Sequence, residues 1–312
     1  MLKATKIILI VGGALVALGL AVTIIGFTTA AGSAKRAGKE VYEQKEEIIT
    51  EDFDNIKICE ISHDIEIRES DDGEVKIEYW DSEKYVHKIE VKGDTLSIGV
   101  NTYSDDTPWW ERISFDIDWV SGEMGEEHQM IVYLPEGEYG NIELDSVSAD
   151  ISVPENYTFE DITVNTTSGE IKATCKAGGK VDISSVSGEI QLANGTPSDI
   201  EINTTSGNAN LDDMTVAGLT NISTISGEVT LTNVVTDDVD INTTSGDIRF
   251  NDLTTGTANI DTTSGEVTGT IAGDHEYDTS TVSGDIDLPS SINGEPEISI
   301  STVSGDISLK AA

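Results

Sequence analysis

The chain has 312 residues, long enough for two domains, and carries 58 acidic against 18 basic side chains. The formal net charge of -40 at pH 7 repels phosphate groups and excludes nucleic acid as a natural partner. The two cysteines, Cys59 and Cys175, lie far apart and exclude a disulfide-stapled scaffold.

An apolar run with interspersed Gly and Thr extends from Ile7 to Phe27. At about 1.5 Å per residue it is long enough to span a bilayer core of about 30 Å, so we expect a membrane anchor within residues 1–34. Small residues at 30–34 leave open its cleavage as a signal peptide. Basic residues flank both ends of the run. A short tail with two lysines is harder to translocate than to leave inside, so we expect the bulk of the chain outside the membrane.

After a charged juxtamembrane linker at 35–50, residues 51–140 form a segment of short alternating runs. Examples are Ile56-Lys57-Ile58 and Val75-Lys76-Ile77, and turn signals such as Asp71-Asp72-Gly73 separate the runs. Apolar and polar residues that alternate with a period of two predict β-strands with one buried face.

This segment contains an acidic insertion at 101–127 that is rich in aromatic residues. It holds three of the four tryptophans of the chain. One interpretation is that these rings cap or fill the β core. The other is an exposed platform for a glycan or a protein, because aromatic rings dominate contact energies. The candidate binding residues are Tyr103, Trp109, Trp110 and Trp119.

From residue 141 to 312 the chain is a repeat marked by Ser-Gly and an acidic residue. Nine copies follow at spacings of 19 to 21 residues, with Ala149 in place of glycine in the first copy and Asn208 in place of the acid in the fourth. Periods of this size indicate stacked supersecondary units. Glycine suits a sharp corner that needs either positive φ or close packing. The corner glycines are Gly169, Gly188, Gly207, Gly227, Gly246, Gly265, Gly284 and Gly305.

Apolar side chains recur six and four residues before the marker serine, and three and five residues after it, as at Val181, Ile183, Ile190 and Leu192. Residues two apart share one face of a strand. Each copy therefore predicts a strand, a corner, a second strand and a looser return. The fold expected is all-β, a parallel β-solenoid of about nine coils, right-handed as in common β-helices. A Thr or Ser two residues before each marker suggests a ladder of hydroxyl groups inside the corner.

One acidic residue per coil would stack into a column. One interpretation is a solvated, charged face that keeps the protein soluble. The other is a row of weak Ca²⁺ or Mg²⁺ sites, because hard cations prefer carboxylate oxygens. No other cofactor is expected. The column consists of Asp150, Glu170, Glu189, Glu228, Asp247, Glu266, Asp285 and Asp306.

No catalytic constellation stands out. The four histidines are scattered without metal-ligand spacing, and from residue 141 onward only five Lys or Arg residues occur. We therefore expect no enzyme. The repeat runs to Leu309 without a cap, so we expect an uncovered last coil that invites end-to-end association.

An anchor, the β segment from Phe53 and the repeated "TTSGEI", "SVSGEI" and "TVSGDI" resemble the bacterial putative adhesin family, whose members are envelope β-solenoids. The resemblance implies a bacterial envelope protein with a link to the envelope-stress response. Together with the anchor expected at 7–27, it predicts a single-pass protein of the bacterial cell membrane. The leading function is a structural or binding protein that contacts a protein or glycan of the envelope. The alternative is a regulatory or sensory envelope-stress protein that contacts another membrane protein. A carbohydrate-active β-helix enzyme is the third option.

Overall fold

The computed structural model describes residues 41–83, 85–100, 128–174, 176–289 and 297–311. These residues form a 24-stranded sheet and a small three-stranded sheet, and none of them is helical. Within this part of the chain no helix has the length and hydropathy needed to cross a bilayer. The expected anchor at 7–27 lies outside the described residues.

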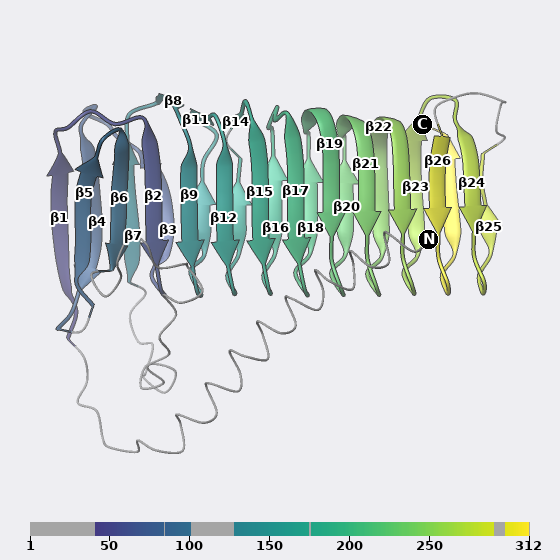
Figure 1. Cartoon of the computed structure of the whole chain (residues 1–312), viewed down its shortest axis with the longest axis horizontal. Coiled ribbons are helices and arrows are strands. Elements are labelled where there is room, and N and C mark those ends of the chain that lie inside the picture. The colour runs from purple at the N-terminus through teal and green to yellow at the C-terminus, as the bar shows by residue number, and fades with distance from the viewer. Residues whose placement is uncertain (1–40, 84, 101–127, 175, 290–296, 312) are drawn as a thin grey trace, which may run out of the picture.

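The strands line up along one axis as two long, facing runs (Figure 1). The first run is β5 (His87–Lys92), β6 (Thr95–Val100), β2 (Asn55–Glu60), β9 (Ile142–Ser146), β12 (Ile162–Thr166), β15 (Lys180–Ser185), β17 (Asp199–Thr204), β19 (Thr215–Ser223), β21 (Val235–Asn242), β22 (Ile248–Asp261), β26 (Glu297–Ser301) and β24 (Glu276–Ser280).

The second run is β1 (Glu43–Ile49), β4 (Val75–Asp81), β7 (Gln129–Leu134), β3 (Asp64–Glu69), β10 (Ile151–Val153), β13 (Ile171–Ala173), β16 (Ile190–Ala193), β18 (Ala209–Asp212), β20 (Val229–Thr232), β22, β23 (Val267–Ala272), β27 (Ile307–Ala311) and β25 (Ile286–Asp287). Three strands of the return segments, β8 (Gly137–Tyr139), β11 (Tyr157–Phe159) and β14 (Lys176–Ala177), form the small sheet. The β1–β4, β4–β7 and β5–β6 pairs are antiparallel, and the other pairs are parallel.

Equivalent positions of successive copies pair directly, which confirms a parallel β-solenoid. Ile162 pairs with Val181, which pairs with Ile200, and all three are at most 3% exposed. The aliphatic columns thus form one continuous core that no single coil could bury. About eight turns follow one another in chain order, from the copy with Asp64 to the copy with Glu266.

The segment at 51–140 is not separate from the solenoid. Strand β2 pairs in parallel with β9, and β3 pairs with β10, so Asn55–Glu69 form the first coil of the same stack. The interval expected to be a linker, 35–50, also contributes strand β1, which pairs with β4. The sheet therefore continues across the expected boundary at residue 141.

The two last copies exchange places in the stack, so the copy that ends the chain is covered on both sides and the preceding copy forms the edge, in place of the last copy that was expected there. Strand β26 pairs with β22 on one side and with β24 on the other, and β27 lies between β23 and β25 in the same way (Figure 1). Burial explains this order. The final copy has Ile298, Ile300 and Ile307 fully buried, whereas the preceding copy has Tyr277 and Thr279 at equivalent positions. The less apolar copy therefore lies at the edge.

Close packing explains the corner glycines better than backbone conformation does. Only Gly169 and Gly188 have positive φ, at 120° and 140°. At Gly227 a Cβ atom would lie 1.8 Å from the carbonyl oxygen of Gly207, and the other corner glycines are equally tight. The Thr and Ser hydroxyl groups inside the corners do not form the expected ladder from coil to coil. Instead the Thr204 hydroxyl accepts a hydrogen bond from the amide of Gly207 in its own corner, 3.0 Å away, and the corners of Gly227, Gly246 and Gly265 repeat this contact.

Candidate functional site

The acidic column lies along the line of corners, and its aspartates differ from its glutamates. Asp150 Oδ1 accepts a hydrogen bond from the amide of Glu170 at 2.7 Å, and Asp247 Oδ1 accepts one from Glu266 at 3.0 Å. The same contact joins Asp64 to Asp150, Asn208 to Glu228 and Asp306 to Asp285. A short side chain reaches the amide of the next coil and satisfies it. The column is thus partly a structural feature of the stack.

The column offers one carboxylate per coil and does not converge on a point. Arg249 lies across two coils of it and forms ion pairs with Glu228 and Asp247. In the described ranges, one group of three residues alone brings potential metal-binding atoms together, and it contains no member of the column. Binding of Ca²⁺ or Mg²⁺ along the column stays a prediction.

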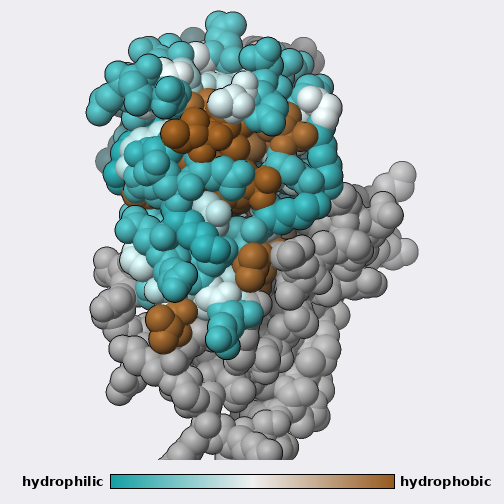
Figure 2. Space-filling view, turned by 90° about the vertical axis from the view of Figure 1, so that its left-hand side faces the viewer, coloured by the Kyte–Doolittle hydropathy of each residue, from teal (hydrophilic) through white to brown (hydrophobic). Residues whose placement is uncertain are grey.

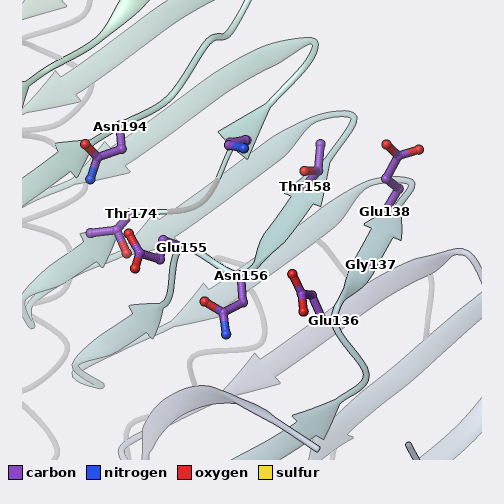
Figure 3. A pocket seen from close by; sticks show the side chains of 9 residues that line it. Glu136, Gly137, Glu138, Glu155, Asn156, Thr158, Thr174 and Asn194 are labelled. Carbon is purple, nitrogen blue, oxygen red and sulfur yellow. The ribbon is translucent and has the colours of Figure 1, made fainter.

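An open hollow of about 440 Å³ lies beside β8, β11 and β14 (Figure 3). Glu136, Glu138 and Glu155 line it together with Lys176 and neutral polar residues. Asn156, also in the lining, donates a hydrogen bond to Glu69 Oε2 at 2.6 Å. The hollow is acidic and solvated, and the described residues of its lining include no histidine or cysteine. None of these lining residues belongs to the group of converging potential metal ligands found in the described part of the chain. The other predicted binding residues, Tyr103, Trp109, Trp110 and Trp119, lie outside the described residues.

Three ionisable side chains converge at the corner of the first coil. Glu60 ends β2, His63 lies in the turn before β3, and His87 begins β5. All three are at least nine-tenths buried, and one potential ligand atom from each lies within 4.8 Å of the other two. Their positions follow from the repeat. Glu60 pairs with Ser146 of the next coil, and His63 is placed where later coils have the corner glycine. The first coil therefore replaces the usual corner with a cluster of charged side chains.

The His87 ring is held between two carboxylates. Its Nε2 lies 2.7 Å from Glu60 Oε2, and its Nδ1 lies 2.8 Å from Asp81 Oδ1. Lys45 donates to the other oxygen of Asp81 at 2.7 Å. Because both ring nitrogens face acceptors, the imidazolium, which donates from both, fits this arrangement.

Burial and charge act in opposite directions on these groups. Burial alone would raise the pKa of Glu60, but its contacts with His63 and His87 outweigh burial and hold that pKa well below its usual range. Burial opposes the charge of His87, yet Glu60 and Asp81 together raise its pKa. Burial likewise opposes the charge of Asp81, while Lys45 and His87 lower its pKa. The cluster is therefore a compensated set of buried charges.

His63 differs from its neighbours because one of its nitrogens is unsatisfied. Its Nδ1 atom is buried and makes no hydrogen bond with the described residues, and it lies 3.5 Å from Glu60 Oε1. Aromatic rings surround it: Tyr42 meets it edge-on at 5.7 Å between centroids, and His128 lies at 5.9 Å. Trp80 and Tyr79 contact His128 and His87. Figure 2 views this end of the stack, where an apolar area lies within a mostly hydrophilic surface.

The expectation that the histidines are scattered is wrong for three of the four. His63, His87 and His128 are separated by 24 and 41 residues in sequence, and only the stacking of β2, β5 and β7 brings them together. The sequence contains a pattern that predicts part of this cluster. Residues 55–65 align with 141–151, since both begin Asn-Ile and carry Ser-x-Asp-Ile at the corner. That alignment would have placed Glu60 and His63 at a corner.

Comparison with known proteins agrees with this fold. The profile of the family described as Toastrack DUF4097 matches residues 53–224 and 178–312. No curated protein matches the chain. Solved structures that align with it include a putative adhesin from Parabacteroides distasonis, at 15% identity and a TM-score of 0.43, covering 87% of this chain and 98% of that chain.

A putative adhesin from Bacteroides fragilis aligns at 12% identity and a TM-score of 0.39, covering 90% of this chain and 98% of that one. A protein named putative lipid binding protein from Parabacteroides distasonis aligns at 18% identity and a TM-score of 0.38, covering 86% and 96%. The resemblance to the bacterial putative adhesin family is confirmed. The chain belongs to the Toastrack DUF4097 family.

Proposed function

We propose that this protein is a non-enzymatic structural or binding module of the bacterial envelope. A single anchor at residues 7–27 would hold it, with the solenoid displayed outside the membrane. Its partner would be an envelope protein or glycan, since a net charge of -40 disfavours nucleic acid. The exposed side chains of the stacked sheets would form the contact surface.

The observation that carries this proposal is the uninterrupted register of the outward-facing side chains. On the first run of strands, Glu143, Thr163, Asp182 and Glu201 succeed one another, one per coil. On the second, the outward row is Ser152, Lys172, Gln191, Asn210, Thr230 and Arg249. A periodic, flat polar row suits contact with an extended partner along its length. Catalysis instead requires several groups directed at one atom.

The basic side chains of the solenoid support the same view. Lys180 forms ion pairs with Asp182 and Glu201, and Arg249 pairs with Glu228 and Asp247. Both are partly exposed and bound to neighbouring coils. They neutralise carboxylates of the stack, and this role differs from that of a basic residue that activates a nucleophile.

A two-part experiment on the full chain in living cells tests this proposal. Protease added to intact cells should remove a tag placed after Ala312, because the solenoid is expected outside. A photoreactive side chain at Asn221, which follows Glu201 on the first outward row, or at Thr230 on the second, should then give covalent adducts with envelope components. The same side chain at Asp71, in the turn after β3, serves as the control. A tag protected until lysis, or adducts from Asp71 alone, would contradict the proposal.

A further inference from the structure

We propose that Glu60, His63 and His87 bind one divalent transition-metal cation of the first row, with Zn²⁺ the principal candidate. The proposal goes beyond display of the solenoid and does not depend on it. It rests on the geometry of the corner cluster at the first coil.

The donor set suits this class of cation. Two imidazole nitrogens and one carboxylate are ligands that Zn²⁺, Co²⁺ and Ni²⁺ accept, whereas Ca²⁺ and Mg²⁺ prefer oxygen alone. With bonds of about 2.0–2.2 Å, tetrahedral ligand atoms lie roughly 3.4 Å apart. His63 Nδ1 and Glu60 Oε1 already lie 3.5 Å apart. His87 Nε2 and Glu60 Oε2, at 2.7 Å, would need to separate modestly.

The unsatisfied nitrogen of His63 is the second, independent observation. A buried imidazole nitrogen without a hydrogen bond is unfavourable, and few such atoms persist without a reason. Here the atom is directed at a carboxylate whose other oxygen meets a second histidine. A cation between the three side chains would satisfy it. The position of His63 at the corner also supports a cation site. Later coils have a tightly packed glycine at this point, whereas the first coil has a histidine.

Outer contacts would hold the ligands in place. Asp81 accepts from His87 Nδ1, which directs Nε2 toward Glu60, and Lys45 in turn holds Asp81. This carboxylate–histidine arrangement is usual behind metal-binding histidines because it fixes the orientation of the ring. The amide of Ile61 donates to Glu60 Oε1 at 2.7 Å and orients that carboxylate.

A bound cation would join elements that are distant in sequence. Glu60 and His63 flank the first corner, His87 belongs to the outermost strand β5, and Asp81 ends β4 of the opposite run. The cation would therefore cross-link the N-terminal end of the stack, where the coil pattern gives way to antiparallel pairs. Binding would stabilise the folded chain, since the site forms only on folding.

The test uses the full-length protein, freed of metal by a chelator and titrated with ZnCl₂ at constant ionic strength. We expect one tight equivalent by calorimetry, a rise in melting temperature, and the absorption bands of a low-symmetry site when Co²⁺ replaces Zn²⁺. His63→Phe is the most informative variant, because it keeps an aromatic ring and removes a nitrogen, Nδ1, that makes no hydrogen bond with the described residues. It should remain folded with a lower melting temperature, because Glu60 loses one of its two histidine partners, and its affinity for Zn²⁺ should fall by more than about 100-fold. Asp81→Asn should weaken binding by about 10–100-fold.

His275→Gln is the matched control. His275 is also buried with an unsatisfied Nδ1, but it belongs to no group of potential ligands in the described part of the chain. The His275→Gln variant should still bind one equivalent of Zn²⁺ tightly. Loss of one equivalent in His63→Phe and its retention in His275→Gln would support the site. Equal binding by the parent and His63→Phe, or no tight equivalent in the parent, would overturn it and leave a proton-bridged cluster that binds no metal.

Discussion

Asp306 Oδ1 accepts a hydrogen bond at 2.8 Å from the amide of Asp285, a residue that precedes it by 21 positions. In every other contact of this kind, the side chain of the earlier copy accepts from the amide of the next copy. The reversal shows that the copy of Asp306 lies inside the stack and the copy of Asp285 lies at the edge. Chain order and spatial order therefore differ at this end.

This order predicts unequal effects at two equivalent positions. Ile307 and Ile286 pair in register, but Ile307 is fully buried and Ile286 is 43% exposed. Ile307→Ala should lower the free energy of unfolding by about 2–5 kcal/mol, because it leaves a cavity. Ile286→Ala should cost less than about 1 kcal/mol. Denaturant titration of the two variants measures both values. A larger loss in Ile286→Ala would contradict the exchanged order.

The edge copy also predicts weak self-association. Val282 is 82% exposed and Ile286 is partly exposed beside strands whose outer backbone groups have no neighbour among the described strands. Exposed strand edges pair with other chains, and a charge on the edge prevents this. We expect sedimentation velocity of the purified full-length protein to show oligomers that grow with concentration. Ile286→Lys should reduce them, whereas Leu219→Lys, at an exposed position in the middle of the stack, should not. Identical behaviour of the two variants would count against pairing at this edge.

The periodic features of the fold could be predicted from the sequence because each rests on a local rule that recurs. The aliphatic columns and the corners follow from residue spacing alone. The exchange at the C-terminal end does not, because two neighbouring copies compete for one interior place. The final copy has Ile298 and Ile300 where the preceding copy has Tyr277 and Thr279. Placing the final copy inside the stack buries more apolar area, which favours the observed order of the two copies.

The corner cluster was missed for a different reason. Glu60 and His63 belong to a copy separated from the main repeat by residues 70–140, and His87 reaches them through the antiparallel pairing of β5 with β6. Spacing in sequence carries no information about such a contact. The burial of charged residues at a corner is visible only once the coils are stacked.

The corner glycines predict a strong effect of a single methyl group. In Gly227→Ala the new Cβ atom would lie 1.8 Å from a backbone oxygen, so the coils would have to separate. We expect a loss of roughly 3 kcal/mol or more in the free energy of unfolding. Gly93→Ala is the matched control: its φ is 66°, but nothing lies within 4 Å of the added atom. In Gly93→Ala, backbone strain alone should lower the free energy of unfolding by about 1–2 kcal/mol. The prediction fails if Gly227→Ala is the milder change in denaturant titration.

The amide-accepting side chains of the acidic column predict a smaller, position-specific effect. Asn208 Oδ1 accepts from the amide of Glu228 at 3.0 Å, so Asn208→Ala should lower the free energy of unfolding by about 0.5–1.5 kcal/mol. Asn208→Asp should retain the contact. A glutamate of the same column, changed in Glu266→Ala, should have little effect, since no hydrogen bond to the Glu266 side chain occurs among the described residues. Equal losses in Asn208→Ala and Glu266→Ala would show that the contact does not contribute.

Asp261 gives a prediction about pH. Burial and the nearby charge of Asp240 raise the pKa of Asp261 above its usual value. A raised folded-state pKa means that Asp261 contributes stability when protonated and that this contribution is lost as pH rises through the folded-state pKa. Asp261→Asn should therefore raise the melting temperature at pH 7, and the gain should vanish below about pH 3, where the unfolded chain is protonated as well.

Asp240→Asn provides the internal control, because it removes the neighbouring charge and leaves Asp261 in place. It should also raise the melting temperature at pH 7, and the double variant should gain less than the sum of the two single changes. Additive gains would mean that the two carboxylates do not interact. If the difference in melting temperature between Asp261→Asn and the parent is the same at pH 3 and pH 7, burial does not disfavour the charge of Asp261.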